Sequence, residues 1–299
     1  MKLSDVKTCC KDGLQIMRDC EFEYTYLIGK PQKENAKVIS FVGSPKFVDG
    51  LFEYETAGVI CTPDVYEVIK DTYKGGIALA DNAKTAFFEI HNYLAVQYRE
   101  DIDTYIDPTV DIHPTAVIAE KNVYIGKNVT ICAYSVIKEG TKIGDDTIIR
   151  EGTVIGGPAF YYYGEKDERK LVSSTGGVKI GNNVEIHANC IIEKGVMFEN
   201  TIIGDNSKID NCVVVGHDTK IGKDCTVAGN SIFAGGVTLK DDVFVGVSAT
   251  VSPNVVIAEK AKISSGAVVT KNVPAETQMS GNFAIEHRSF IKHIKSISK

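Results

Sequence analysis

The sequence has no long hydrophobic run, no paired cysteine motif and no excess of basic residues. No apolar stretch approaches the roughly 20 residues that a membrane-spanning helix needs, and charged residues interrupt the first 20 positions, so we expect neither a membrane span nor a signal peptide. The eight cysteines include no CxxC pair, which predicts reduced thiols and no metal site. The balance of 33 basic and 39 acidic residues argues against nucleic-acid binding. Together these absences favour a cytoplasmic protein.

The sequence does have a period of six. From Ile203 to Val269 an aliphatic or aromatic residue occupies every sixth position, and a small or short branched residue follows four positions after nearly every one. No α-helix has a period of six, whereas a strand with alternating faces that ends in a turn does. Three such strands make one triangular coil of roughly 18 residues. The same phase appears earlier, at Ile106–Ile118, Ile125–Ile155 and Ile180–Phe198.

These repeats predict a mostly β protein built as a parallel β-helix of about eight coils. Three interruptions are visible: one inserted residue between Ile118 and Ile125, one deleted residue between Phe198 and Ile203, and 19 extra residues between Ile155 and Ile180. The long loop contains four adjacent aromatic residues, Phe160 to Tyr163. We interpret this loop as part of a substrate site in preference to a solvated excursion, because long loops in compact repeats are usually functional.

The β-helix is flanked by two segments with different patterns. Residues 1–100 read as a small α/β domain, the repeats extend over residues 105–274, and residues 275–299 form a C-terminal extension with a helix. In this helix Phe283, Phe290, Ile294 and Ile297 share one face. The helix either caps the open end of the β-helix or presents its basic face to an acidic carrier or to cofactor phosphates, and both can hold.

The histidines point to the chemistry. His113 and His187 follow inward isoleucines and so occupy turns, and His217 lies in a turn between Gly216 and Asp218. One coil of about 18 residues beyond His217 is Gly235, at a strand spacing of about 4.8 Å. A histidine base stacked beside exposed backbone N–H groups is a geometry suited to acyl transfer.

At these residues the chain resembles a known family. The hexads, the segment Lys208–Asn211 before Gly216 and His217, and the ending Gly281–Ala284 resemble the left-handed β-helix acyltransferases of lipid A synthesis. Among these the UDP-3-O-acylglucosamine N-acyltransferase family is the best match, and the left hand of the β-helix is implied by this resemblance alone. The family also has an N-terminal uridine-binding domain in which two aromatic residues clamp the uracil. Phe41 and Phe47 match that pair, and Ser44 stands where the family tends to have asparagine.

The resemblance implies a homotrimer with active sites between adjacent prisms. His217 would be the general base and the Gly235 N–H the oxyanion donor, while Asn211 and Asp218 would bind substrate. Asp218 would either orient the imidazole or contact the acyl donor. The donor would be a phosphopantetheine thioester on acyl carrier protein or coenzyme A, the acceptor the amine of a UDP-linked amino sugar, and no cofactor would be tightly bound.

Some positions depart from the family pattern. The sequence has Thr250–Asn254 where the family carries a second turn histidine, and Glu193–Gly195 where it has Asp-Arg-Gly. These changes leave open an acetyl- or short-acyltransferase that acts on another nucleotide amino sugar, or on a sugar hydroxyl. A zinc hydratase on the same fold needs three converging histidines and fits poorly. A non-catalytic scaffold subunit remains an alternative, against which His217 and the Phe41 and Phe47 pair argue.

Overall fold

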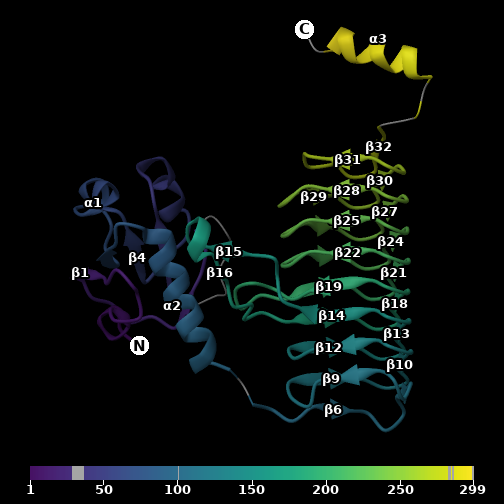
Figure 1. Ribbon diagram of the computed structural model, residues 1–299, viewed down its shortest axis with the longest axis horizontal. Coiled ribbons are helices and arrows are strands. Elements are labelled where there is room, and N and C mark those ends of the chain that lie inside the picture. The colour runs from purple at the N-terminus through teal and green to yellow at the C-terminus, as the bar shows by residue number, and fades with distance from the viewer. Residues whose placement is uncertain (29–36, 100, 282–283, 285, 298–299) are drawn as a thin grey trace. The chain divides into compact units, whose positions relative to one another are not determined.

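The structure is a computed structural model that describes residues 1–28, 37–99, 101–281, 284 and 286–297 of the 299-residue chain. The chain forms two compact units, both drawn in Figure 1. The first unit contains Met1–Asp101 together with Pro158–Thr175 and Val196–Phe198. The second contains Ile102–Gly157, Gly176–Gly195 and Glu199–Lys299.

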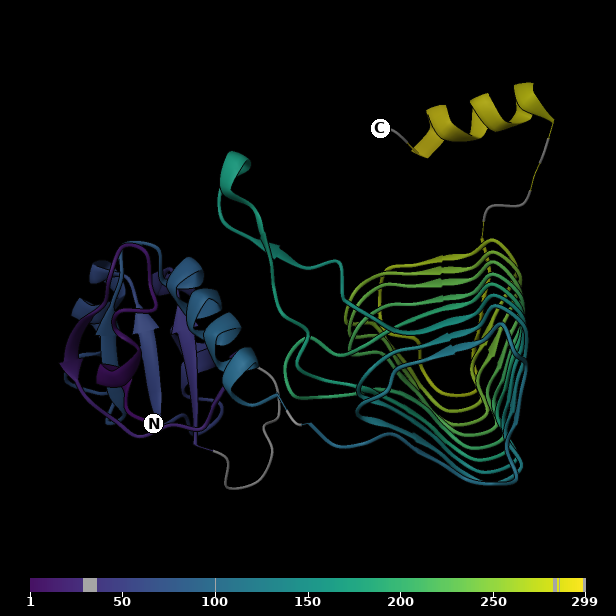
Figure 2. The same ribbon diagram turned by 60° about the horizontal axis from the view of Figure 1, so that its bottom comes forward.

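The second unit is a parallel β-helix, and its triangular cross-section is seen in Figure 2. Within the described residues its strands form three flat sheets, called faces 1, 2 and 3. Face 1 contains β7 (Asp111–Ile112), β10 (Thr130–Ile131), β13 (Ile148–Ile149), β18 (Glu185–Ile186), β21 (Lys208–Ile209), β24 (Thr226–Val227), β27 (Phe244–Val245), β30 (Lys262–Ile263) and β32 (Gln278–Met279). Face 2 contains β8 (Val117–Ile118), β11 (Val136–Ile137), β14 (Val154–Gly157), β19 (Ile191–Glu193), β22 (Val214–Val215), β25 (Ile232–Phe233), β28 (Thr250–Val251) and β31 (Val268–Val269). Face 3 contains β6 (Tyr105–Ile106), β9 (Val123–Ile125), β12 (Thr141–Ile143), β17 (Val178–Ile180), β20 (Thr201–Ile203), β23 (Lys220–Ile221), β26 (Thr238–Leu239) and β29 (Val256–Ile257).

The predicted register of the coils is confirmed. Ile203 pairs with Ile221, and Ile221 pairs with Leu239, so equivalent residues of successive coils lie side by side. Their side chains are buried in one continuous core that fills the prism. The β-helix is left-handed. Parallel crossovers are usually right-handed because twisted strands favour that hand, but strands of two to four residues carry too little twist to impose it.

Most turns between faces have one residue in the left-handed backbone region. This residue lies three positions after the inward one, and in five successive turns it is Asn206, Cys212, Asp218, Asp224 and Asn230, with φ between 58° and 63°. Asn and Asp tolerate this conformation better than other residues with a side chain because their short polar groups form local hydrogen bonds. The turn chemistry therefore repeats with the same period as the core.

All three predicted interruptions lie at the corner where face 2 passes into face 3. The insertions after Ile118 and Ile155 are as predicted, but the assignment of Phe198 to an inward hexad position is wrong. Phe198 belongs to the first unit, has φ +49°, and packs its ring 4.7 Å from that of Tyr24. Residues 194–200 form a second loop, and the strand series resumes at β20.

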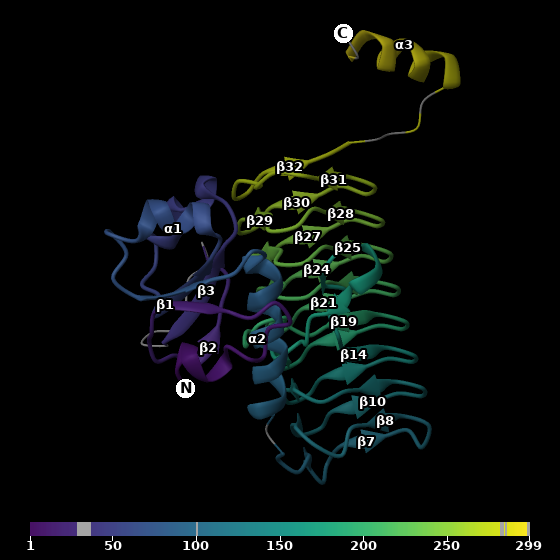
Figure 3. The same cartoon turned by 60° about the vertical axis from the view of Figure 1, so that its left-hand side comes forward.

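The first unit is a three-layer α/β/α domain, visible in Figure 3. Its sheet has the strand order β1-β5-β4-β3-β2, with β1 antiparallel to β5 and the other neighbours parallel. Residues of β4 alternate between two apolar clusters, one with α2 and one with α1. The elements are β1 (Gln15–Arg18), β2 (Tyr24–Thr25), β3 (Val38–Val42), β4 (Gly58–Cys61), α1 (Pro63–Ile69), β5 (Gly76–Leu79) and α2 (Ala83–Gln97).

The long loop also belongs to this unit. It contains the hairpin of β15 (Tyr162–Tyr163) and β16 (Lys170–Leu171). Tyr163 is buried and stacks on Phe88 of α2, whereas Phe160 is 82% exposed. Within this aromatic run, Tyr163 thus packs in the core of the α/β domain, whereas Phe160 is exposed.

The C-terminal helix is α3 (His287–Ile297). Phe290 and Ile294 lie on its surface and remain 46% and 37% exposed, so in the described structure the helix does not bury these residues against the end of the prism. Phe283 and the side chain of Ile297 lie outside the described residues. Among the helices that the structure describes, none is both long and apolar enough to cross a membrane.

His91 of α2 fixes the loop within the α/β domain. The fully buried imidazole accepts a hydrogen bond at Nδ1 from the Thr25 hydroxyl, 2.7 Å away, and Nε2–H donates to the Ser173 carbonyl at 2.8 Å. Asn92 accepts a bond from the Ser173 N–H and donates one to the Leu171 carbonyl. Burial favours the neutral imidazole and lowers the pKa of His91 below the ordinary 6.5.

We therefore predict that acid weakens the domain through His91. Because the folded pKa is lowered, the unfolded chain binds a proton first as pH falls below about 6.5, and the free energy of unfolding decreases by up to about 1.4 kcal/mol per pH unit. His91→Gln keeps one acceptor and one donor but does not titrate. Thermal unfolding between about pH 7.5 and 5.5 should show a smaller loss of stability in this variant than in the wild type. Equal pH dependence in the two proteins would contradict the assignment.

Candidate functional site

His217 lies in the turn after β22, at the corner between faces 2 and 3. Asp218 takes the left-handed conformation of this turn, with φ 59°, and its Oδ2 lies 2.9 Å from Nδ1 of His217. A carboxylate at this distance accepts a hydrogen bond from Nδ1–H, which leaves Nε2 of a neutral imidazole with its lone pair. The side chains are 21% and 15% exposed, so the pair is largely shielded and still reachable from solvent. The geometry supports the first of the two predicted roles for Asp218, orientation of the imidazole.

A third residue, which the sequence analysis did not assign to the site, holds the backbone of this turn. The Glu193 carboxylate accepts a hydrogen bond from the His217 N–H at 3.1 Å. Glu193 follows Ile192, which pairs with Val215, so it lies one coil below Gly216. The loop of residues 194–200 makes this coil longer than the regular repeat of about 18 residues. A fixed repeat length therefore could not place Glu193 beside His217.

Gly235 lies directly above His217, as the coil length predicts. A Cβ atom added to Gly235 would be 2.4 Å from both Nε2 and Cε1 of the imidazole. Any residue other than glycine at position 235 would therefore displace the His217 ring. The Gly236 N–H donates to the His217 carbonyl at 2.8 Å. Within the described residues the Gly235 N–H has no hydrogen-bond acceptor. The arrangement thus puts an available backbone donor next to the imidazole.

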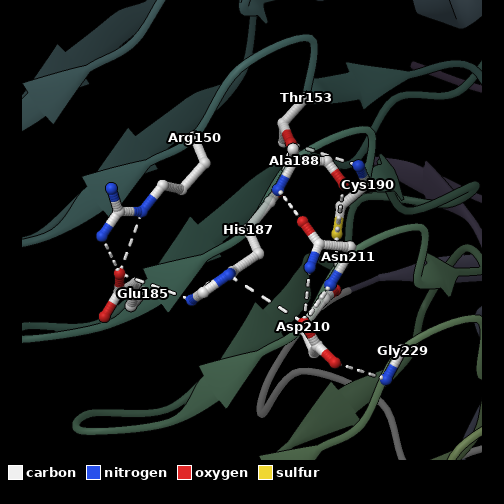
Figure 4. A network of polar contacts seen from close by, with 9 residues as sticks. All are labelled: Arg150, Thr153, Glu185, His187, Ala188, Cys190, Asp210, Asn211 and Gly229. Atoms are coloured by element: carbon white, nitrogen blue, oxygen red, sulfur yellow. Dashed lines mark hydrogen bonds and ion pairs between the residues drawn. The ribbon is translucent and has the colours of Figure 1, made fainter.

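Asn211 lies at a different corner, between faces 1 and 2, and the structure does not bring it to His217 within one chain. Its side chain donates to Asp210 Oδ1 at 2.7 Å and accepts from the Ala188 N–H at 3.2 Å. Asp210 Oδ2 in turn accepts from the Gly229 N–H at 2.9 Å. These bonds join the turns of three successive coils, as Figure 4 shows.

His187 belongs to the same corner. Its Nε2 lies 3.4 Å from Glu185 Oε1, and its Nδ1 lies 3.9 Å from Asp210 Oδ1. Arg150 donates two hydrogen bonds to Glu185 Oε1, and these bonds lower the pKa of the Glu185 carboxyl below its ordinary value. The corner therefore carries a fixed ion pair beside a histidine that is 38% exposed (Figure 4).

The proposed uracil clamp lies in the α/β domain. Phe41, near the end of β3, packs its ring 5.0 Å from Phe87 and 6.1 Å from Phe88. Phe47 is 52% exposed with the Lys46 ammonium 4.7 Å above its ring, and Ser44 is partly buried before the short helix Pro45–Phe47. Among the described ring contacts none joins Phe41 to Phe47. Phe41 thus has a packing role, and a clamp by the two rings stays a prediction.

Three family models match parts of the chain. They are the GMPPB C-terminal domain over residues 175–249, the bacterial transferase hexapeptide (six repeats) over 122–157, and the hexapeptide repeat of succinyl-transferase over 236–271. The last two describe the repeat that builds the β-helix. Both of these matched stretches lie in the β-helix, so this unit contains hexapeptide repeats.

Several curated relatives share one name. The chain is 27% identical to UDP-3-O-acylglucosamine N-acyltransferase of Herminiimonas arsenicoxydans, over 84% of this chain and 80% of the relative. It is 37% identical to a probable UDP-3-O-acylglucosamine N-acyltransferase 2, mitochondrial, of Arabidopsis thaliana, over 54% of this chain and 53% of the relative. The solved structure of Arabidopsis UDP-N-acetylglucosamine acyltransferase shows 24% identity and a TM-score of 0.43, covering 59% of this chain and 71% of that one.

The contact between Gly235 and the imidazole predicts the effect of one methyl group. Gly235→Ala should displace the His217 ring from Asp218 and shift its NMR resonances, because the added Cβ occupies the place of the ring. The free energy of unfolding should change by less than about 1 kcal/mol, since a side chain moves more easily than the backbone. Gly157→Ala is the control, because its Cβ would meet no atom within 4 Å. An undisturbed His217 resonance in Gly235→Ala would refute this close approach.

Proposed function

We propose that the protein is an N-acyltransferase that moves an acyl group from a thioester to the amine of a UDP-linked amino sugar. One observation carries the proposal: the imidazole of His217, held at Nδ1 by Asp218, has Nε2 beside the unpaired N–H of Gly235 in the described structure. A general base and an oxyanion donor are the two groups that attack of an amine on a thioester needs. The name of the curated relatives supports the same reaction.

In the reaction the amine nitrogen forms a bond to the thioester carbonyl carbon while Nε2 of His217 accepts a proton from the amine. The carbonyl oxygen becomes negative and accepts a hydrogen bond from the Gly235 N–H. The carbon–sulfur bond then breaks, and the proton on Nε2 passes to the leaving sulfur. The products are an amide and a free thiol. The Asp218 carboxylate stabilises the imidazolium that exists between the two proton transfers.

The donor in this proposal is a phosphopantetheine thioester, on acyl carrier protein or coenzyme A, and it acts as a substrate and not as a bound cofactor. The acceptor's uracil would bind in the α/β domain at Ser44 and Phe47, which follow the end of β3 at Val42. Phe47 supports this interpretation because its ring is 52% exposed, and an exposed aromatic ring can stack on a base. We infer a cytoplasmic site of action, where nucleotide sugars and these thioesters are available.

Face 2 supports a homotrimer. Its outward row is aliphatic except for one threonine, and Val117, Ile191, Ile232 and Val268 are 43% to 59% exposed. The outward rows of the other two faces include lysines, for example Lys208 and Lys262 on face 1 and Lys142 and Lys179 on face 3. An uncharged aliphatic sheet surface of this length favours burial against another copy of the chain. The outward residues of face 2 are Val117, Val136, Val154, Ile191, Val214, Ile232, Thr250 and Val268.

The first test removes the base. His217→Ala should lower kcat by about 10² to 10⁴-fold, the usual contribution of a general base, and leave the acceptor KM and thermal stability near wild type. The acceptor for the assay is a UDP-linked amino sugar and the donor an acyl carrier protein thioester. A variant that kept more than about a tenth of the wild-type kcat would rule out general base catalysis by His217.

A second test addresses the nucleotide. Phe47→Ala should raise the acceptor KM more than it lowers kcat, because stacking on the uracil contributes about 0.5 to 1.5 kcal/mol beyond area burial. Its thermal stability should hardly change, since Phe47 is 52% exposed. Phe52→Ala is a control, as Phe52 is 53% exposed in the same domain. If the two variants have the same acceptor KM, Phe47 does not bind the nucleotide.

A further inference from the structure

The loop of residues 194–200 links the candidate site to the α/β domain. Its tip, Val196–Phe198, belongs to the α/β domain, whereas the residues on both sides of the tip belong to the β-helix. Glu193 ends β19 directly before this loop, and its carboxylate accepts the hydrogen bond from the His217 N–H. Only two residues separate Glu193 from the tip. The residue that holds the turn of His217 therefore continues almost directly into the other unit.

The tip is fixed within the α/β domain by its own contacts. Val196 and Met197 are buried in the apolar cluster that contains Phe88 of α2. The Thr175 hydroxyl donates a hydrogen bond to the Val196 carbonyl at 3.1 Å and accepts one from the Phe198 N–H at 3.0 Å. The position of the tip therefore depends on the packing of this domain.

The segment between Glu193 and the tip is packed too tightly to absorb a displacement. A Cβ atom added to Gly195 would be 2.0 Å from the Glu199 carbonyl oxygen and 3.0 Å from Oδ1 of Asp218. The Gly195 carbonyl also accepts a hydrogen bond from the Gly176 N–H at 3.1 Å. Gly195 thus lies against the carboxylate that orients the imidazole. A shift of this segment therefore reaches both the imidazole and the carboxylate, the first through the hydrogen bond of Glu193 and the second through direct packing.

The hydrogen bond to Glu193 also decides which backbone N–H of this corner is open. Val215 pairs with Phe233, so the His217 N–H and the Gly235 N–H are equivalent groups in successive coils. The first is bonded to Glu193, and the second has no acceptor within the described residues. Glu193 therefore holds the base from the coil below and leaves one N–H available for the developing oxyanion.

We propose that Glu193 is a positioning residue for His217, and that the loop makes its position depend on the packing of the α/β domain. The register of β19 sets the height of Glu193, and the short connection to the tip ties this residue to the other unit. The inference rests on the proposed function, in which the α/β domain binds the acceptor's nucleotide. The domain that binds the acceptor thereby also sets the geometry of the base.

The kinetic test removes the carboxylate. Glu193→Ala should lower kcat by about 10- to 100-fold with little change in the acceptor KM, because a small misplacement of a catalytic group costs up to about 10²-fold in rate. Glu193→Gln should stay within about threefold of the wild-type kcat, because its amide oxygen still accepts the bond from the His217 N–H. A purely structural role would lower thermal stability and leave kcat of the folded protein unchanged. Equal kcat in Glu193→Ala and the wild type, or an equal loss in both variants, would overturn the positioning role.

The second test loosens the tip and needs no substrate. Thr175→Val nearly keeps the side-chain volume and removes both hydrogen bonds of the hydroxyl. In this variant the NMR signals of the His217 imidazole, identified by their absence in His217→Ala, should move relative to wild type, and kcat should fall by about tenfold. Thr56→Val is the matched control, because the Thr56 hydroxyl lies 2.7 Å from the Tyr73 hydroxyl in the same domain and outside the loop. The control also loses a buried hydrogen bond, but it should leave the His217 signals in place.

Two results would overturn the dependence on the α/β domain: His217 signals in Thr175→Val that match those of the wild type, or equal shifts in Thr175→Val and Thr56→Val. The second result would show a general response to a destabilised domain and not a path through the loop. Because these signals are read without substrate, failure of the wild type to acylate any amino sugar would refute the proposed function and would not alter this measurement.

Discussion

The ladder of backbone hydrogen bonds between successive coils is the constraint on which the rest of the structure depends. Strands of two residues have little stability alone, and they persist here because each pairs in register with the strand above and the strand below. A slip of one residue would turn every inward side chain to the surface. The same ladder places Gly235 above His217 and Glu193 below it, so the site is a product of the register and not of a specialised loop.

The architecture could be predicted from the sequence because a period of six has one structural reading. The period alone did not identify which residues leave the prism. Phe198 has the correct phase after Ile192, yet its ring packs 4.7 Å from Tyr24 and 5.9 Å from His91 in the other unit. A contact between residues so far apart in the chain leaves no trace in local spacing. For the same reason the membership of residues 158–175 in the α/β domain could not be predicted.

The candidate site, too, could be predicted only in part from the sequence. The relation of His217 to Gly235 followed from the coil length, and that of His217 to Asp218 from their adjacency. Glu193 was missed because the extra residues after it change the local repeat length. Phe41 shows a different limit, since an aromatic residue near a strand end can face the core or a ligand, and its contacts with Phe87 and Phe88 show that it packs in the domain. The corner of Asp210 and Asn211 lies away from His217 within one chain, and the period of the repeat does not tell which of the three corners carries a site.

The most direct test of the account is mass spectrometry of the products that the wild-type protein makes from a panel of UDP- and dTDP-linked amino sugars. Each sugar would be incubated with acetyl-coenzyme A and with acyl carrier protein thioesters. The account predicts a UDP-sugar product that is heavier by one acyl group, linked as an amide and therefore stable to hydroxylamine. No acylated product from any pair, or a hydroxylamine-labile ester as the main product, would contradict N-acyl transfer.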